Sequence, residues 1–171
     1  GPFKPRRPIL GVVFAGEVVG TGAAVTKYTK GDKLFGWTSL MKLGGHAEFV
    51  ALSQQGAFTR MPDGLPYTDA AAIPFGFGTA RHFLQKASVS KGQHVLIYGA
   101  SGSVGSAAVQ LARQMGAEVT AVCSTRNTEL VSSLGAHHVL DYTKDDIMAK
   151  RDQYDVVFET VGKLPFSECL K

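Results

Sequence analysis

Cysteine is scarce in this chain of 171 residues, which contains only Cys123 and Cys169. Two cysteines are too few for the disulfide framework of a small secreted domain, and they do not have the spacing of a zinc-binding cluster. The sequence therefore predicts a reducing compartment. We expect a cytoplasmic location, with the mitochondrial matrix as the alternative because the chain begins with Gly1 and not with methionine.

Long apolar runs and basic stripes are also missing. No apolar segment approaches the roughly 20 residues that cross a bilayer, so the sequence predicts no membrane span. The net charge is only +4, and the basic residues are scattered without interleaved aromatic residues, which disfavours nucleic acid as a partner. Hydrophobic residues make up 44% of the chain and charged residues 19%, as in an ordinary globular protein with room for one domain or parts of two.

The most informative stretch covers residues 94–126. An apolar run, VLIY, stops at Gly99, and further glycines follow at three-residue steps, Gly102 and Gly105. Apolar residues at helical spacing come next, and a second apolar run covers residues 119–123. A strand, a glycine turn, a helix and a strand in this order predict the first half of a dinucleotide-binding unit.

Glycines suit such a turn because a diphosphate is bound by backbone N–H groups at the start of a helix, where side chains would hold it away. The turn reads GASGSVG, with Ala100 and Ser101 between its first two glycines, and so departs from the common G-x-G-x-x-G pattern. The alternative is a glycine turn that serves only the packing of the helix on the strand.

Two rival motifs do not fit this turn. A nucleotide-triphosphate loop ends in Gly-Lys-Ser/Thr, and no lysine occurs between Gly99 and Met115. A hydrolase nucleophile elbow needs G-x-S-x-G around Ser101, but Ser103 occupies the last position. We therefore interpret Ser101 as a hydroxyl donor to phosphate and not as a nucleophile.

The end of the second strand indicates which dinucleotide is bound. An NAD site places an acid there to bind the ribose 2′-hydroxyl, whereas no acid occurs here before Glu129. Ser124, Thr125 and Arg126 are able to donate to a 2′-phosphate, and arginine has the fork geometry for it. We expect NADP(H) as the cofactor; the alternative is that Arg126 is an ordinary solvated surface residue.

The N-terminal part is expected to be all-β. Residues 9–22 combine β-branched residues with glycines and predict a bent strand. Further short strands are predicted at residues 33–37, 46–52 and 57–61. Thr68 is predicted to cap a short helix that Pro74 interrupts, before a second helical face in residues 77–87.

Beyond Arg126 helices and strands continue to alternate. One helix is expected to end at Gly135, which is a good position for a residue just past a helix. The remaining predicted elements are a third strand at Val139 and Leu140, a helix in residues 145–150 and a fourth strand in residues 154–159. The whole pattern predicts an α/β protein with one domain over residues 1–75 and a second over residues 76–171.

The motifs GDKLFGW, GGHAEFVAL, AAAIPFGFGTA, VLIYGASGSVGSAAVQLA, HHVLDYT and YDVVFETVG follow one another along the chain. In this order they resemble the medium-chain dehydrogenase/reductase superfamily, and within it the zinc-free quinone oxidoreductase-like branch. The resemblance implies a partial GroES-like β-barrel domain followed by a partial Rossmann doubly wound parallel sheet that binds NADP. It also implies that the chain is an interior fragment of a longer protein, and that this protein is a homodimer.

The resemblance also bears on metal binding. Zinc-dependent relatives carry Gly-His-Glu where this chain has Gly11, Val12 and Val13, and valine cannot bind zinc. No four-cysteine lobe occurs between Trp37 and Thr68, and the histidines are isolated or adjacent on one predicted strand. We therefore predict that the protein binds no metal.

Without zinc to polarise a carbonyl, hydride from a nicotinamide suits an acceptor that is already electron-poor. The predicted activity is an NADPH-dependent reduction of a small-molecule quinone or α,β-unsaturated carbonyl. Two alternatives stay open: a cofactor-binding protein without catalysis, and an NADP-dependent alcohol dehydrogenase. No catalytic residue is identified, because a proton from solvent would suffice.

The resemblance implies roles for individual residues. Those expected to surround the diphosphate are Gly99, Ala100, Ser101, Gly102, Ser103, Val104 and Gly105. Ser124 and Arg126 would face the 2′-phosphate. Tyr142 would border the adenosine phosphate, with a half-buried core tyrosine as the alternative. Thr79 would lie beside the nicotinamide, unless its hydroxyl bonds its own helix, and Val161 and Gly162 would lie near the ribose.

Overall fold

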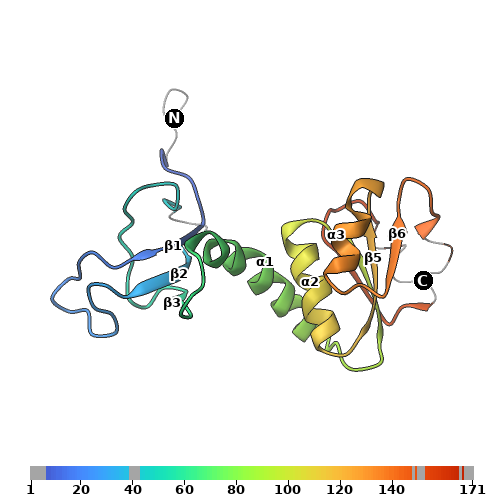
Figure 1. Cartoon of the computed structure of the whole chain (residues 1–171), viewed down its shortest axis with the longest axis horizontal. Helices are drawn as coiled ribbons and strands as arrows, with labels where there is room; N and C mark the ends of the chain where they lie inside the picture. Colours follow the sequence, from blue (N-terminus) through green and yellow to red (C-terminus); the bar gives the residue numbers. More distant parts are fainter. Residues whose placement is uncertain (1–6, 39–42, 148, 150–152, 166, 168–171) are drawn as a thin grey trace. The chain divides into compact units, whose positions relative to one another are not determined.

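The computed structural model describes residues 7–38, 43–147, 149, 153–165 and 167. The chain divides into two compact units, residues 1–75 and 76–171 (Figure 1). Cys169 and part of the helix predicted at residues 145–150 lie outside the described ranges; of that helix, Ile147 and Ala149 have 3₁₀ conformation. No helix among the described residues combines the length and the apolarity needed to cross a bilayer.

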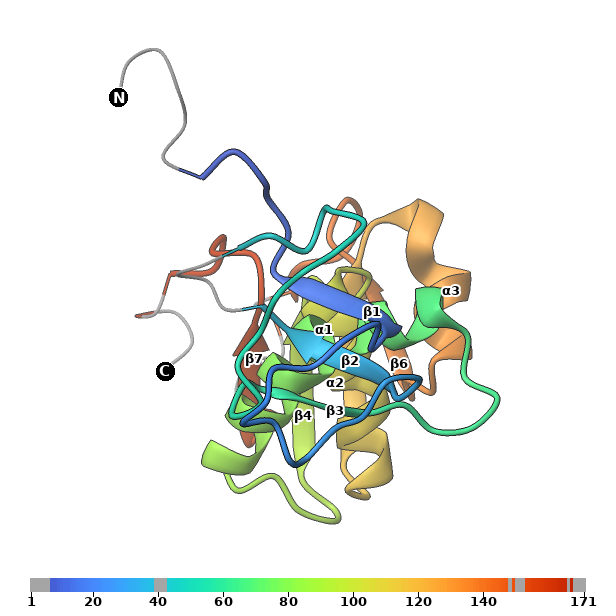
Figure 2. The same cartoon turned by 90° about the vertical axis from the view of Figure 1, so that its left-hand side faces the viewer.

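The first unit contains one antiparallel sheet in the order β1-β2-β3, whose strands lie side by side in Figure 2. The strands are β1 (Val13–Glu17), β2 (Lys33–Trp37) and β3 (Phe58–Arg60). Gly36 pairs with Phe58, and a Cβ added to Gly36 would lie 2.4 Å from the Phe58 Cβ. Glycine at this position therefore permits β2 and β3 to pair closely. The prediction for residues 33–37 is confirmed, while the strand predicted over residues 9–22 is confined to β1.

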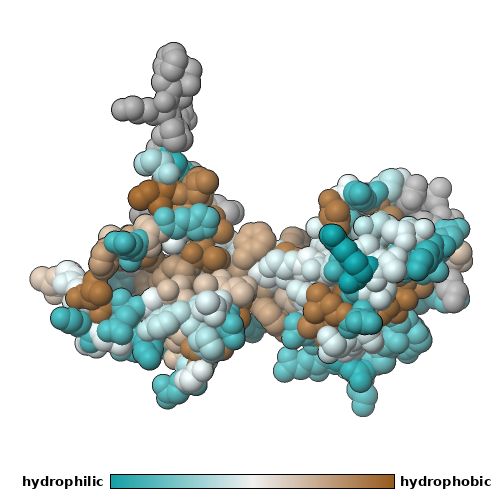
Figure 3. Space-filling view, turned by 45° about the horizontal axis from the view of Figure 1, so that its top comes forward, coloured by the Kyte–Doolittle hydropathy of each residue, from teal (hydrophilic) through white to brown (hydrophobic). Residues whose placement is uncertain are grey.

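The strand predicted at residues 46–52 is wrong, because these residues form no strand in the structure. The His46 N–H and the preceding Gly44 N–H both donate to the Leu10 carbonyl, at 2.9 and 3.1 Å, which is not the pattern of a regular ladder. Phe49 is 71% exposed, so no face of this segment is buried to stabilise a strand. Figure 3 shows apolar residues (brown) on the surface of this unit, and the exposed apolar side chains include Ile9, Leu10, Val19, Phe49 and Val50.

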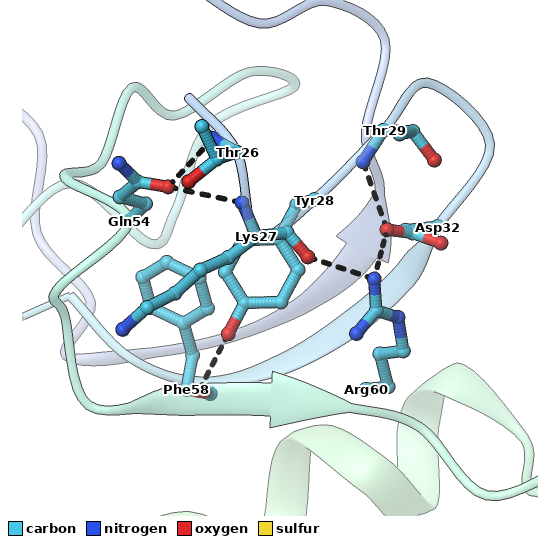
Figure 4. A network of polar contacts seen from close by, with 8 residues as sticks. All are labelled: Thr26, Lys27, Tyr28, Thr29, Asp32, Gln54, Phe58 and Arg60. Atoms are coloured by element: carbon cyan, nitrogen blue, oxygen red, sulfur yellow. Dashed lines mark hydrogen bonds and ion pairs between the residues drawn. The ribbon is translucent and has the colours of Figure 1, made fainter. Parts of the chain in front are cut away.

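The loop between β1 and β2 is held by a network of polar contacts (Figure 4). Arg60 Nη2 donates to the Lys27 carbonyl at 2.8 Å and to Asp32 Oδ2 at 2.9 Å. The Asp32 carboxylate also accepts from the Thr29 N–H, and this bond together with Arg60 lowers the pKa of Asp32. On the other side, Gln54 Oε1 accepts from the Lys27 N–H at 3.1 Å. Side chains from two distant segments thus fix a loop that has no helix or strand of its own.

Helix α1 (Tyr67–Lys86) runs without interruption for 20 residues, so the break predicted at Pro74 is wrong. Proline removes one backbone N–H from the helix, but apolar side chains on both sides of Pro74, those of Ala70, Ala80 and Leu84, are buried and stabilise the helix across it. Thr68 is also not the N-cap. The helix begins one residue earlier, its first bond runs from the Ala70 N–H to the Pro66 carbonyl, and the Thr68 hydroxyl donates to Asp69.

The second unit contains a parallel sheet of four strands in the order β6-β5-β4-β7. The strands are β4 (His94–Tyr98), β5 (Glu118–Cys123), β6 (His138–Asp141) and β7 (Val156–Glu159). They are connected by helix α2 (Ser103–Gln114), the short turn η1 (Thr125–Asn127) and helix α3 (Thr128–Ser133). In order along the chain the sheet reads 3-2-1-4, which confirms the predicted Rossmann topology.

The two faces of this sheet carry different side chains because neighbours along a strand point to opposite faces. From β4, Val95 and Ile97 pack with side chains of α1, α2 and α3, whereas Leu96 packs with Val122 and Ile147 on the other face. The buried residues of α2 are small, namely Gly105, Ala107, Ala108, Val109 and Ala112. Small residues let α2 lie close to the sheet, with its first turn at the carboxyl ends of β4 and β5 (Figure 1). Helix α3 ends as predicted, with Gly135 at φ +103° just beyond it.

Candidate functional site

The candidate site begins at the glycine turn that follows β4. Gly99 has φ +79°, and a Cβ there would lie 2.3 Å from Val161 Cγ2 and 2.6 Å from Thr160 Oγ1. The N–H groups of Gly99 and Ala100 both donate to the Val122 carbonyl, at 3.1 and 3.0 Å. Glycine is therefore required at position 99 by both its backbone conformation and the close approach of the segment that follows β7.

The second and third glycines of the turn serve different purposes. A Cβ on Gly105 would lie 2.2 Å from the Gly99 carbonyl oxygen, so Gly105 allows α2 to start directly against the turn. A Cβ on Gly102 would have only that same oxygen as a neighbour, at 3.4 Å, and Gly102 has φ −77°, which any residue adopts. Packing thus explains Gly99 and Gly105, but it does not explain Gly102.

Gly102 is the N-cap of α2 and offers no side chain to cap the helix. The N–H groups of Ser103, Val104 and Gly105 have no acceptor within the helix, as at every helix start. Among the described residues, no side-chain oxygen at this cap accepts a hydrogen bond from them. The N–H donors of the first helical turn and the positive end of the helix dipole therefore remain at the start of α2, which is an arrangement suited to a phosphate.

Helix α1 also approaches this edge. A Cβ on Gly76 would lie 2.5 Å from the Ser103 carbonyl oxygen and 2.8 Å from Ser103 Oγ, so glycine permits α1 to pass against the start of α2. Thr79 is one helical turn further along the same face of α1. Its side chain is half-buried, and no hydrogen bond of its hydroxyl to another described residue, its own helix included, is present. The sequence did not identify Gly76.

At the end of β5, Asn127 connects Ser101 and Ser124, two of the predicted site residues. Asn127 itself was not predicted from the sequence. Asn127 Nδ2 donates to Ser101 Oγ at 3.0 Å and to Ser124 Oγ at 3.2 Å. Asn127 thereby links the glycine turn after β4 with the turn after β5. An asparagine four residues beyond the strand end was the available signal.

Thr125 and Arg126 have different environments within η1. The Thr125 hydroxyl donates to Asp141 Oδ2, so its hydrogen is used inside the protein. The Arg126 side chain is exposed, and among the described residues it has no hydrogen-bond or ion-pair partner. Within the described ranges the guanidinium is therefore unpaired at the end of β5, whereas Thr125 offers its backbone N–H there.

Asp141, at the end of β6, is a carboxylate that is only 7% exposed. The hydrogen bond from the Thr125 hydroxyl and those from the Thr143 side chain and N–H, at 2.7 and 3.0 Å, lower the pKa of Asp141 to about 2. Lys144 Nζ lies 3.6 Å from the same carboxylate. Asp141 is thus ionised at neutral pH and fixes the start of η1 through Thr125.

Tyr142 follows Asp141 and stacks on Tyr98, with ring centroids 6.3 Å apart and an angle of 26° between the planes. Tyr142 is 49% exposed, so one side of its ring remains open to solvent. Burial, followed by the proximity of Tyr142 and Glu159, raises the pKa of Tyr98. The two rings form an aromatic surface at the carboxyl ends of β4 and β6.

The segment after β7 is held by a carboxylate that the sequence reasoning also missed. Glu159 accepts from the N–H groups of Val161, Gly162 and Lys163 at 3.0, 2.5 and 3.2 Å. The Thr160 hydroxyl donates to the Tyr98 carbonyl at 2.8 Å and so joins this segment to the end of β4. Val161 and Gly162 therefore lie beside the glycine turn, as the contact of Val161 with Gly99 also indicates.

Across the described ranges, no group of three or more histidine, cysteine, aspartate or glutamate side chains could hold a metal ion. These residues therefore offer no donor set for zinc. The absence of a metal from the whole protein stays a prediction.

A parallel sheet in the order 3-2-1-4, with a glycine turn and an uncapped helix start at its carboxyl edge, defines a dinucleotide-binding protein of the Rossmann class. A family model described as zinc-binding dehydrogenase matches residues 103–171. The chain is 35% identical over 174 residues to the 2-methylene-furan-3-one reductase of Solanum lycopersicum, covering 95% of this chain and 45% of that protein. It is also 35% identical over 173 residues to the chloroplastic NADPH-dependent alkenal/one oxidoreductase of Arabidopsis thaliana, with the same shares covered.

Among solved structures, the quinone oxidoreductase of Pseudomonas syringae matches with a TM-score of 0.84 and 28% identity, over 94% of this chain and 51% of that one. The chain belongs to the medium-chain dehydrogenase/reductase superfamily and is quinone oxidoreductase-like. It spans about half the length of the curated relatives that it matches.

Proposed function

We propose that the protein is an NADPH-dependent oxidoreductase that transfers a hydride to a quinone or an α,β-unsaturated carbonyl. The observation that carries the proposal is the uncapped start of α2 at Gly102, where a glycine that packing does not require leaves the first N–H groups of the helix without a side-chain cap. The start of α2 suits a diphosphate, because glycine at position 102 has no side chain that could block a phosphate from reaching these N–H groups. When bound, the nicotinamide supplies the hydride.

In the proposed site the diphosphate lies on the glycine turn. The N–H groups of Ser103 and Val104 donate to it, and the Ser101 hydroxyl adds a further donor. The same N–H groups carry the positive end of the helix dipole, which favours an anion there. The remaining residues of the turn, Gly99, Ala100, Gly102 and Gly105, shape the backbone and keep side chains out of the way.

The 2′-phosphate of NADPH is proposed to bind at the end of β5. Arg126 carries a free guanidinium, Ser124 contributes a hydroxyl, and Thr125 contributes its backbone N–H. No acid stands at this strand end to bind the 2′-hydroxyl of NAD. Tyr142 would then flank the adenosine, while Thr79, Val161 and Gly162 would lie along the nicotinamide half of the cofactor.

The substrate class follows from the acceptor chemistry. Gly11, Val12 and Val13 stand where zinc-dependent relatives carry Gly-His-Glu, so the proposal is that no metal polarises a carbonyl and that an electron-poor quinone or enone is the better hydride acceptor. The relatives named as alkenal/one oxidoreductase and furanone reductase support the same class. Residues 1–75 are proposed to be part of the substrate-binding domain, and residues 76–171 the cofactor-binding domain.

The test is the affinity for the two nucleotides in the wild-type protein and in two variants. In Arg126→Ala we expect the Kd for NADPH to rise about 10- to 100-fold, since a hydrogen bond to a charged group is worth about 1.5–3 kcal/mol, and the Kd for NADH to stay unchanged. Lys86→Ala, a change of a basic residue at the far end of α1, is the control and should bind NADPH like the wild type. Tighter binding of NADH than of NADPH would refute the cofactor assignment.

Catalysis is tested separately by NADPH oxidation with a quinone and with an enone. Turnover of either supports the reductase, whereas tight binding of NADPH without turnover of any acceptor favours a cofactor-binding protein that does not catalyse. Zinc-dependent turnover of an alcohol would favour the alcohol dehydrogenase alternative. We also propose a homodimer, which light scattering tests, and a cytoplasmic or mitochondrial location, which fluorescence microscopy of the tagged protein tests.

A further inference from the structure

We propose that Asn127 is a positioning residue that turns the hydroxyls of Ser101 and Ser124 toward the two phosphate groups of the bound nucleotide. The inference rests on the proposed function, because it assigns the two serines to a cofactor site. It starts from the contacts of one amide group, whose nitrogen lies 3.0 Å from Ser101 Oγ and 3.2 Å from Ser124 Oγ.

The hydrogens of this cluster can be counted. A primary amide has two N–H donors, and a serine hydroxyl has one hydrogen to donate and lone pairs to accept. Asn127 gives one hydrogen to each serine, so both hydroxyls act as acceptors toward it. Neither hydroxyl donates to any other described residue. Each serine therefore keeps its own hydrogen, and that hydrogen must find an acceptor outside the described residues.

A phosphate oxygen is the acceptor that suits both positions. Ser101 lies in the turn before the uncapped start of α2, and Ser124 lies two residues before Arg126, whose guanidinium has no partner among the described residues. A hydroxyl that accepts one hydrogen bond is polarised and becomes a better donor in the next. Asn127 thus prepares two donors at once, one beside the proposed diphosphate and one beside the proposed 2′-phosphate.

The backbone position of Asn127 supports a role beyond local structure. Asn127 is the N-cap residue of α3, where an asparagine side chain normally accepts a hydrogen bond from the first turn of the helix. Here the side chain makes no such bond and turns to the serines instead. Because η1 leads directly into α3 and the Thr128 N–H already donates to the Thr125 carbonyl, the Asn127 side chain is available to join the two strand ends.

The experiment measures the Kd of NADPH and of NADH in the full chain by fluorescence titration. In Asn127→Ala we expect the Kd for NADPH to rise about 5- to 30-fold, as for the loss of two oriented hydrogen bonds, and the Kd for NADH to rise less because only the Ser101 donor is affected. Asn127→Asp keeps the shape of the side chain, but its carboxylate accepts hydrogen bonds from both serine hydroxyls. The serine hydrogens are then no longer available to the ligand, so we expect the Kd for NADPH to rise at least as much as in Asn127→Ala.

A double-mutant comparison of Asn127 and Ser124 distinguishes a positioning role of Asn127 from a purely structural one. In a background of Asn127→Ala, the further change Ser124→Ala should raise the Kd for NADPH by less than about 2-fold, because the orientation of that hydroxyl is already lost. The control is Thr128→Ala, which removes a bond from the Thr128 hydroxyl to the Thr125 carbonyl in the same turn but leaves the serines untouched. This control should bind NADPH like the wild type.

The outcomes distinguish the two proposals. A wild-type protein that binds neither nucleotide overturns the proposed function and this inference with it. A wild-type protein that binds NADPH tightly while Asn127→Ala binds equally well overturns only the role of Asn127. Independent, multiplicative effects of Ser124→Ala and Asn127→Ala, or an equal loss in Thr128→Ala, would also overturn it, because they would show a general need for an intact turn.

Discussion

Replacing Gly105 or Gly102 of the same turn with alanine is expected to affect different properties: Gly105→Ala the stability of the protein, and Gly102→Ala its affinity for NADPH. A Cβ on Gly105 would lie 2.2 Å from the Gly99 carbonyl oxygen and 2.8 Å from the Ala100 Cα. Both neighbours are backbone atoms, so no rotamer change relieves the contact, and α2 has to move about 1 Å off the turn to restore ordinary contact distances. By contrast, a Cβ on Gly102 meets nothing closer than 3.4 Å.

The magnitudes follow from these distances. Overpacking costs about 1–3 kcal/mol, and a contact with rigid backbone belongs at the upper end, from which about 1 kcal/mol of better helix propensity is subtracted. Gly105→Ala should therefore destabilise by about 2 kcal/mol, which lowers the melting temperature by about 4–8 °C in a protein of this size. Gly102→Ala should melt within about 2 °C of the wild type, since its backbone conformation suits alanine.

Thermal unfolding followed by circular dichroism measures the stability, and titration with NADPH measures the site. Gly102→Ala should lose at least about 10-fold in NADPH affinity, because its methyl group lies beside the N–H groups that are expected to bind the diphosphate. A Gly102→Ala protein that binds NADPH as the wild type does, or one that is destabilised as much as Gly105→Ala, would refute the different roles assigned to these glycines.

Two further predictions concern buried or bound carboxylates. The pKa of Asp141, about 2, lies below its value of 3.8 in an unfolded chain, so the ionised group stabilises the fold above about pH 4 and this contribution disappears as the pH falls through 2. Asp141→Asn should accordingly melt at a lower temperature than the wild type at pH 7, and the two melting curves should converge near pH 2; a constant difference at all pH values would contradict this. Glu159→Gln retains only one oxygen for three N–H groups, so we expect faster hydrogen exchange at Val161, Gly162 and Lys163 and a loss of about 1–2 kcal/mol in chemical denaturation, and unchanged exchange at these amides would count against the role of Glu159.

The elements that local pattern determines were predicted well. Strand β2 has the predicted bounds, and the sequence of β4, glycine turn, α2 and β5 appears within a residue or two of its predicted positions. In these stretches the apolar spacing and the glycines indicate the same structure, and burial of the same residues then stabilises it. The end of α3 at Gly135 is a similar case, because the positive φ there suits glycine.

The failures occurred where tertiary contacts outweigh local preference. Residues 46–52 have the composition of a strand, but the segment does not extend the sheet, and the His46 N–H at its start donates to the Leu10 carbonyl. Pro74 is a helix breaker by propensity, yet side chains buried on both sides of it keep α1 whole. Neither outcome is encoded within the few residues around the affected position.

The candidate site divides in the same way. The glycine turn and the free arginine follow from sequence pattern, since spacing and the absence of an acid both concern neighbours along the chain. Asn127 and Glu159 act through hydrogen bonds that depend on how strand ends meet, and Asn127 joins segments 26 residues apart. The use of the Thr125 hydroxyl by Asp141 could not be predicted either, because it depends on β5 and β6 being adjacent.

The carboxylate of Glu159 limits the orientation in which a dinucleotide can bind. The carboxyl edge of the parallel sheet presents two groups of backbone N–H donors, one at the start of α2 and one beyond β7. The second group already donates to the Glu159 carboxylate. A phosphate approaching that second group would meet repulsion in place of hydrogen bonds. We therefore expect a portion of the nucleotide without negative charge to lie there, which would fix the direction in which the ligand crosses the sheet.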